Sequence, residues 1–246
     1  MLESTFIHCP GIGIETERRL WSSGARSWSE YLELEGRVCP SRVHQILRPL
    51  VEESVDRLLA GDYAWFAHIL PQREHWRAYP AFRHRIAYLD IETTGGIDSQ
   101  SLTVVGLYDG LRLRQFVKGD NLDEFPEAID KYAMLVTFFG TGFDLPFLRR
   151  AFGMDFHQLH VDLCFLLKRL GHKGGLKRVE QAFGLIRSAE TVGLSGADAV
   201  ELWWLYKRGD ETALQKLLAY NADDVINLET LLETAYPLIA AKTMTE

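Results

Sequence analysis

The sequence has few cysteines, no long hydrophobic run and no excess of positive charge. Among its 246 residues are only three cysteines, Cys9, Cys39 and Cys164, and no two of them form a Cys-x-x-Cys pair typical of zinc or redox sites. This odd, scattered set indicates no disulfide framework, so we expect the reducing cytoplasm as the compartment. No apolar run approaches the roughly 20 residues of a membrane helix. The first residues show no signal-peptide pattern, and we therefore expect no membrane association.

Negative charge exceeds positive charge along the chain. There are 27 Lys and Arg against 34 Asp and Glu, for a net charge of −7. This balance argues against a protein that holds nucleic acid by bulk electrostatic attraction, although a local basic patch remains compatible with transient binding. The hydrophobic fraction of 47% is that of an ordinary globular protein. The length allows one sizeable core and a small accessory module.

A predicted buried strand with two carboxylates is the central feature of the sequence. Residues 86–91 read Ile-Ala-Tyr-Leu-Asp-Ile, and Thr-Thr-Gly-Gly at 93–96 follows as a turn. Side chains alternate along a strand, so Asp90 and Glu92 point to the same side. Two buried carboxylates repel each other unless a cation lies between them, and Mg²⁺ prefers oxygen ligands. The alternative is a solvated pair at a sheet edge, since Asp-x-Glu is common in an acidic chain.

A second acidic segment follows another apolar run at 134–138. Glycines at 140 and 142 turn the chain, and Asp144 then precedes Leu-Pro, which is typical of a helix start. Asp144 is therefore predicted either to cap a helix or to take part in metal binding together with Asp90 and Glu92.

A third segment lies on a long helix predicted over residues 213–236. Tyr220 and Asp224 are four residues apart and share one face of this helix. Asp223 points about 100° away around the helix and is expected to be exposed to solvent.

In this order, the three segments resemble the motifs of the DnaQ-like 3′–5′ exonucleases, in the DEDDy subclass whose third motif is Tyr-x-x-x-Asp. They are most similar to the YprB-type RNase H-like domain family, over roughly the last two-thirds of the chain. The resemblance implies an α/β fold with an RNase H-like mixed sheet, in which three antiparallel strands precede parallel strands. Helices flank this sheet. One departure is Phe139, which stands where the family usually has asparagine. That difference bears on how substrate is positioned.

The resemblance also implies a metal-dependent 3′–5′ exonuclease that releases nucleoside monophosphates. Its catalytic residues and metal ligands would be Asp90, Glu92, Asp144 and Asp224, holding two divalent cations, Mg²⁺ or Mn²⁺, about 4 Å apart. Tyr220 would orient the attacking water, because an ordinary tyrosine pKa near 10 makes it a poor base at neutral pH.

Contacts to nucleic acid are predicted at the basic, glycine-rich stretch 168–178. Lys177 and Arg178 are the first candidates for phosphate contacts there, although a solvated helical face is the alternative. Thr93, directly after Glu92, is a further predicted contact. Arg187 and residues 188–198 are expected to form a mobile connection over the site.

Residues 1–80 are predicted to form a small helical module, and residues 81–246 the exonuclease domain. The Pro-Gly-x-Gly turn at 10–13 looks like the turn of a helix-hairpin-helix motif. In such a motif Gly11 and Gly13 let backbone N–H groups approach a phosphate, while a plain tight turn before a helix accounts for the same residues.

The expected partner is DNA or RNA with a single-stranded 3′ end. Three other functions remain open. The chain could be a structure-directed endonuclease of the same fold or a catalytically weak nucleic-acid-binding module. It could also be a structural interaction protein without a metal site.

Overall fold

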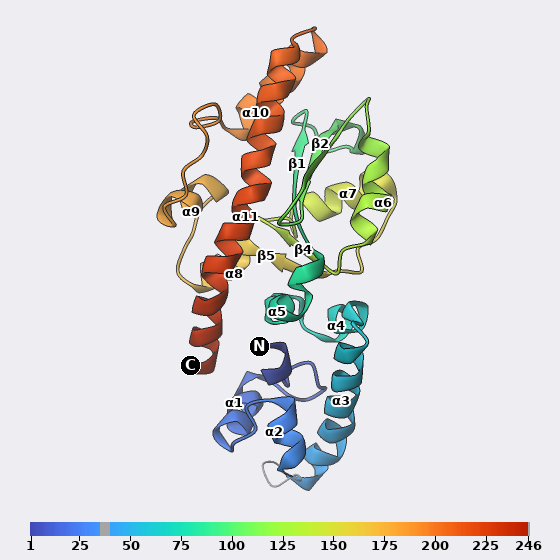
Figure 1. Ribbon diagram of the computed structural model, residues 1–246, viewed down its shortest axis with the longest axis vertical. Helices are drawn as coiled ribbons and strands as arrows, with labels where there is room; N and C mark the ends of the chain where they lie inside the picture. The colour runs from blue at the N-terminus through green and yellow to red at the C-terminus, as the bar shows by residue number, and fades with distance from the viewer. Residues whose placement is uncertain (35–39, 246) are drawn as a thin grey trace.

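A five-stranded mixed sheet forms the centre of the protein in the computed structural model, which describes residues 1–34 and 40–245 (Figure 1). Cys39 lies outside the described residues. The strand order is β3-β2-β1-β4-β5. The strands are β1 (Ile86–Thr93), β2 (Leu102–Tyr108), β3 (Leu113–Val117), β4 (Met134–Thr137) and β5 (Leu159–Asp162).

Strand directions confirm the predicted RNase H-like sheet. β1 pairs antiparallel with β2, and β2 with β3, whereas β4 runs parallel to both β1 and β5. The pair Asp109-Gly110 predicts a two-residue hairpin from sequence alone. That prediction is wrong, because the β2–β3 connection spans residues 109–112. The Asp109 carboxylate accepts hydrogen bonds from the backbone N–H groups of Leu111 and Arg112, which stabilises the longer turn.

Helices cover both faces of the sheet (Figure 1). The long helix α11 packs on one face, and α6 and α7 pack on the other, against Leu89 and Ile91 of β1. α11 is longer at both ends than predicted. The helices of this part are α6 (Phe125–Asp130), α7 (Asp144–Phe152), α8 (Leu163–Arg169), α9 (Leu176–Ala182), α10 (Gly196–Lys207) and α11 (Glu211–Thr245), with 3₁₀ turns at Ser99–Ser101 and Leu122–Glu124.

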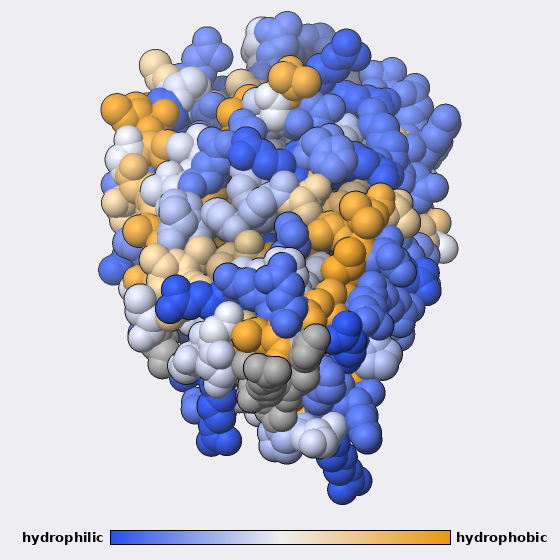
Figure 2. All heavy atoms as spheres, turned by 60° about the horizontal axis from the view of Figure 1, so that its bottom comes forward, coloured by the Kyte–Doolittle hydropathy of each residue, from blue (hydrophilic) through white to orange (hydrophobic). Residues whose placement is uncertain are grey.

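The N-terminal residues form a group of helices at one end of the sheet. Its helices are α1 (Ile14–Ser22), α2 (Trp28–Glu33), α3 (Ser41–Leu59), α4 (Tyr63–Ile69) and α5 (Tyr79–Phe82), with 3₁₀ segments at Leu2–Ser4, Gln72–Ala78 and Arg83–Arg85. Arg77 holds this group together from inside, with ion pairs of 3.0 Å to Glu17 and 2.8 Å to Glu74. Figure 2 shows this end of the molecule, where hydrophilic side chains cover most of the face and hydrophobic ones form a band across it.

This helical group is docked on β5 through a buried histidine. The His160 backbone N–H donates to His75 Nδ1 at 2.9 Å, and the His160 ring lies 3.2 Å from Gln72 Nε2 and 2.9 Å from Thr137 Oγ1. Burial lowers the pKa of His160 to about 4, so the ring is neutral at physiological pH and serves as a structural link. Throughout the described residues, no helix combines the length and the apolar character that a membrane span requires.

Candidate metal centre

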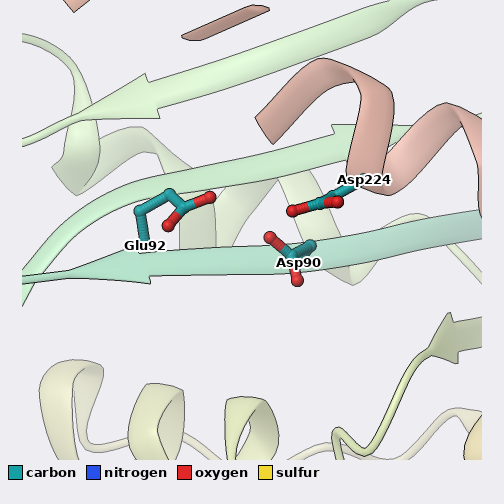
Figure 3. A group of neighbouring side chains, drawn as sticks. All are labelled: Asp90, Glu92 and Asp224. Atoms are coloured by element: carbon teal, nitrogen blue, oxygen red, sulfur yellow. The ribbon is translucent and has the colours of Figure 1, made fainter. Parts of the chain in front are cut away.

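Three carboxylates converge between β1 and α11. One oxygen atom each of Asp90, Glu92 and Asp224 lies within 4.8 Å of the other two. Figure 3 shows Asp90 and Glu92 leaving the same strand toward the helix that carries Asp224. Strand alternation therefore brings the first two together as predicted, and the packing of α11 on the sheet adds the third.

A glycine in β2 allows α11 to approach this closely. Gly106 is paired with Asp90, and a Cβ at Gly106 would lie 2.2 Å from Asn221 Oδ1. Asn221, which is fully buried, donates to Asp90 Oδ2 at 3.1 Å and accepts from Gln115 Nε2 at 3.1 Å. Asn221 thus holds Asp90 in place. Sequence reasoning missed this role, although Asn221 follows Tyr220 directly.

We expect Gly106→Ala to push α11 away from the sheet and to lower the free energy of unfolding by about 1–3 kcal/mol, as overpacked cores do. Urea unfolding measures this loss. Gly196→Ala is the matched control, because a Cβ at Gly196 meets nothing within 4 Å. Equal stability of the two variants would contradict the close packing.

The environment of the three acids disfavours their charged forms. Burial raises the pKa of Asp90 and of Glu92 well above its usual range, and the neighbouring Asp224 and Asp144 carboxylates add to both shifts. Burial also raises the pKa of Asp224 to about 6, against the opposing effect of Arg187. Such shifts mark a site where a cation would be strongly favoured at neutral pH.

One oxygen atom of the site has no protein partner. Within the part of the chain that the structure describes, the buried Oε1 of Glu92 makes no hydrogen bond. A buried carboxylate oxygen without a donor is costly, and a divalent cation would satisfy it. The residues present therefore fit a hard metal ion with oxygen ligands.

Asp144 lies beside this group without joining it. It is the first residue of α7, as predicted, and it is only 3% exposed. Burial raises its pKa to about 7, although the backbone N–H groups of Asp144 and Ile91 hydrogen-bond to its carboxylate. Because Asp144 contributes to the raised pKa of both Asp90 and Glu92, it acts electrostatically on the same site.

A buried arginine, Arg187, contacts the site from the connection predicted to pass over it, but its pairing with an acid of the site was not predicted. Arg187 donates to Asp224 Oδ1 and to Glu180 Oε2, the latter at 2.7 Å, and its side chain is 6% exposed. Asn227 donates to the same Glu180 carboxylate at 2.9 Å. No spacing in the sequence signals this arrangement, because Arg187 is 37 residues from Asp224. Arg187 neutralises part of the charge of Asp224 and leaves Asp90 and Glu92 without an ion pair among the described residues.

The segment that carries Arg187 is fastened to α11 by Asp223. Its carboxylate accepts from the Ser188 backbone N–H at 3.3 Å and from the hydroxyl of Thr191. The prediction that Asp223 is simply solvent-exposed is therefore wrong, because it is half-buried under this connection. The connection also ends earlier than residue 198, since α10 begins at Gly196.

A cleft of about 470 Å³ opens beside the acids. Tyr220 lines it together with Asp90 and Asp224, and burial raises the pKa of Tyr220 above its ordinary value. Lys177 lies over the Tyr220 ring at 4.6 Å, and Arg178 lines the same cleft. The structure thus brings these two predicted contacts next to the acidic group.

The other predicted contacts differ in their positions. Thr93 ends β1 directly after Glu92, and its hydroxyl accepts from the Gly95 backbone N–H at 3.2 Å. Gly11 and Gly13 lie in the N-terminal helical group, before α1 and away from the three acids (Figure 1). Gly11 has φ +82, which fits the predicted turn.

The loop before Asp144 has an unusual backbone conformation. Phe139 has φ +66, and it is the one non-glycine with positive φ among residues 1–34 and 40–245. The carboxylate of Asp162 holds it by accepting the backbone N–H groups of Phe139 at 2.8 Å and Thr141 at 3.0 Å. Asp162 also caps α8 by accepting a hydrogen bond from the Cys164 backbone N–H. A non-glycine residue in this region costs about 1–3 kcal/mol.

Comparison with known proteins places this architecture in a family. Residues 87–236 match the family model of the RNase_H superfamily. A search of curated proteins finds no significant match.

Solved structures that resemble parts of this chain include a DNA polymerase and an exoribonuclease. The family B DNA polymerase from the hyperthermophilic archaeon Pyrobaculum calidifontis has 22% identity and a TM-score of 0.49, over 62% of this chain and 24% of the polymerase chain. Brucella melitensis NrnC with bound Mg²⁺ has 22% identity and a TM-score of 0.43, over 67% of this chain and 78% of NrnC. Escherichia coli RNase D, an exoribonuclease involved in structured RNA processing, has 21% identity and a TM-score of 0.43, over 70% of this chain and 47% of RNase D.

The chain therefore spans less than two thirds of the polymerase and of RNase D. The family match, by contrast, extends over more than half of this chain and covers all five strands except Ile86, the first residue of β1. The chain belongs to the RNase_H superfamily.

Proposed function

We propose that this protein is a metal-dependent nuclease that hydrolyses phosphodiester bonds from the 3′ end of a nucleic acid strand. It would act as a DnaQ-like exonuclease of the DEDDy subclass and resemble the YprB-type RNase H-like domain family. The observation that carries the proposal is the convergence of Asp90, Glu92 and Asp224 within 4.8 Å in a member of the RNase_H superfamily. The raised pKa values of Asp90 and Glu92 and the unpartnered oxygen of Glu92 support a cation-binding site at these acids.

In this proposal, Asp90, Glu92 and Asp224 hold divalent cations, Mg²⁺ or Mn²⁺, and Asp144 is the fourth acid of the site. Divalent ions bound by these acids would supply a water of lowered pKa and stabilisation of negative charge on the phosphate. Asn221 keeps Asp90 oriented toward the other acids. Tyr220 stays protonated, because its pKa is raised, and its hydroxyl orients the attacking water from the cleft wall.

Basic side chains in the cleft are proposed to contact the phosphate backbone. Lys177 and Arg178 line the cleft that contains Asp90 and Asp224, so a strand entering there passes both. Thr93 adds a hydroxyl at the end of β1. Gly11 and Gly13 would provide a separate phosphate contact on a helical module of residues 1–80, distinct from the exonuclease domain of residues 81–246.

A 5′-labelled single strand tests the activity. With Mg²⁺ or Mn²⁺, we expect a ladder that shortens one nucleotide at a time from the 3′ end, for DNA or for RNA, and no cleavage in EDTA. A strand with a blocked 3′ end should resist shortening. Internal fragments from the blocked strand would instead identify an endonuclease.

A catalytically weak nucleic-acid-binding module is the second candidate, and the pairing of Arg187 with Asp224 favours it. If Arg187 remained paired with Asp224, that carboxylate would not be available as a ligand for a cation. Binding of the labelled strand without any shortening in Mn²⁺ would favour this second function.

A further inference from the structure

Exposed aromatic rings stand at the loop that leads into Asp144. Phe139 is 50% exposed and Phe165 is 47% exposed, and their ring centroids are 6.3 Å apart. Phe143, directly before Asp144, is 41% exposed. Single exposed apolar residues are common on protein surfaces, but neighbouring aromatic rings beside a polar site are a more specific feature.

Phe139 is held in its position at a conformational cost. Its φ of +66 suits glycine or asparagine far better than phenylalanine. Asp162 fixes the backbone on both sides of Gly140. Gly142 leaves room for the ring, since a Cβ there would lie 2.8 Å from Phe139 Cζ. A large apolar side chain kept in solvent by a disfavoured backbone conformation is better explained by a ligand than by packing.

The chain path connects Phe139 to the acidic site, because Asp144 follows it by five residues at the start of α7. Phe138, the residue before Phe139, lines the cleft that contains Asp90 and Asp224. Lys177 and Arg178 line the same cleft and can follow a phosphate backbone. Phe165 lines a separate pocket of about 170 Å³ together with Thr141 and Asp162. A strand that places a phosphate at the acids and then follows the loop at residues 139–143 would bring its neighbouring bases to the rings of Phe139 and Phe165.

We propose that Phe139 and Phe165 form a stacking surface for unpaired bases of the nucleic acid, and that this surface selects single strands. The identity of the ligand rests on the proposed nuclease function. Aromatic rings stack on every type of base, so the surface is expected to be tolerant of sequence. A duplex hides the faces of its bases and cannot use the surface until its end is opened.

Binding measured by fluorescence anisotropy in EDTA tests the proposal without turnover. We expect the wild type to bind a single strand about tenfold more tightly than the same strand with abasic nucleotides at its 3′ end. Phe139→Asn and Phe165→Ala should each lose most of this preference, whereas Phe139→Tyr should keep it. Phe139→Asn should also melt no lower than the wild type, because asparagine tolerates positive φ.

Trp204→Ala is the matched control, because Trp204 is an aromatic residue on α10 with the same 47% exposure as Phe165. It should bind like the wild type. Three results would overturn the stacking surface. The wild type could bind the normal and abasic strands equally, it could bind neither strand, or Phe139→Asn and Phe165→Ala could bind as the wild type does.

The two proposals can fail separately. Base-dependent binding without cleavage in Mn²⁺ supports the stacking surface and refutes the nuclease. Cleavage with base-independent binding supports the nuclease and refutes the stacking surface.

Discussion

Replacing Asp90 by asparagine is expected to lower metal-dependent cleavage by about 10³-fold or more. The variant keeps the shape of the side chain and its place beside Asn221 but removes one of the charges that hold the cations. Metal ions contribute several kcal/mol to charge stabilisation in such reactions, and each 1.4 kcal/mol is about tenfold in rate. Single-turnover cleavage of a labelled strand in Mg²⁺ measures the loss. Asp224→Asn should behave in the same way.

The same substitution should make the metal-free protein more stable. Asp90 lies among like charges whose burial is unfavourable, so removing its charge relieves repulsion on Asp224, Asp144 and Glu92. Asp130→Asn is the matched control, since Asp130 is an exposed aspartate at the end of α6 and should change neither property. A variant that is inactive because it has unfolded, or that cleaves as fast as the wild type, would contradict the assignment of Asp90.

The pH dependence of this stability difference follows from the raised pKa values. An acid whose pKa is higher in the folded than in the unfolded protein contributes its full stabilisation below the unfolded pKa of about 4. That contribution is lost as pH rises through the folded pKa. The folded values are about 6 for Asp224 and about 7 for Asp144. In EDTA, the free energy of unfolding of Asp90→Asn should therefore exceed that of the wild type most at pH 8 and least near pH 4. Urea unfolding at both pH values measures this difference.

Arg187→Met is expected to destabilise the metal-free protein by about 3–5 kcal/mol, the range for breaking a buried ion pair. The change leaves Glu180 and Asp224, both nearly inaccessible to solvent, without their cationic partner. Urea unfolding in EDTA measures the loss. Arg57→Met is the matched control, because Arg57 also bridges two carboxylates, Glu53 and Asp62, but on the surface, where little change is expected.

Divalent cations should restore more stability to Arg187→Met than to the wild type. In the wild type a cation must displace Arg187 from Asp224, whereas in the variant that carboxylate is free. The rise in melting temperature on adding Mn²⁺ should thus be larger for the variant. An equal or smaller rise would show that Arg187 and the cation do not compete for Asp224.

Local patterns in the sequence were sufficient for the parts of the site that lie on single elements. Alternation along β1 placed Asp90 and Glu92 on one side, and helical spacing placed Tyr220 and Asp224 on one face. The helix start at Asp144 followed from Leu-Pro after the glycine turn. In each case, the geometry of a single strand or helix determines where the side chain lies.

The remaining features depend on contacts between distant segments. Asn221 reaches Asp90 across 131 positions, and Arg187 reaches Asp224 across 37. The packing of α11 and of residues 184–195 decides which polar side chain lies beside a buried acid. The hydrophobic periodicity of the sequence does not predict that packing. The same holds for Asp223, which was predicted to be exposed and instead binds Ser188 and Thr191.

A crystal structure with Mn²⁺ tests the central claim most directly, because anomalous scattering locates the ion independently of activity. We expect an anomalous peak among Asp90, Glu92 and Asp224, with the Arg187 side chain moved off Asp224. Arg187 still bound to Asp224, with no Mn²⁺ at the three acids, would contradict a metal-dependent nuclease.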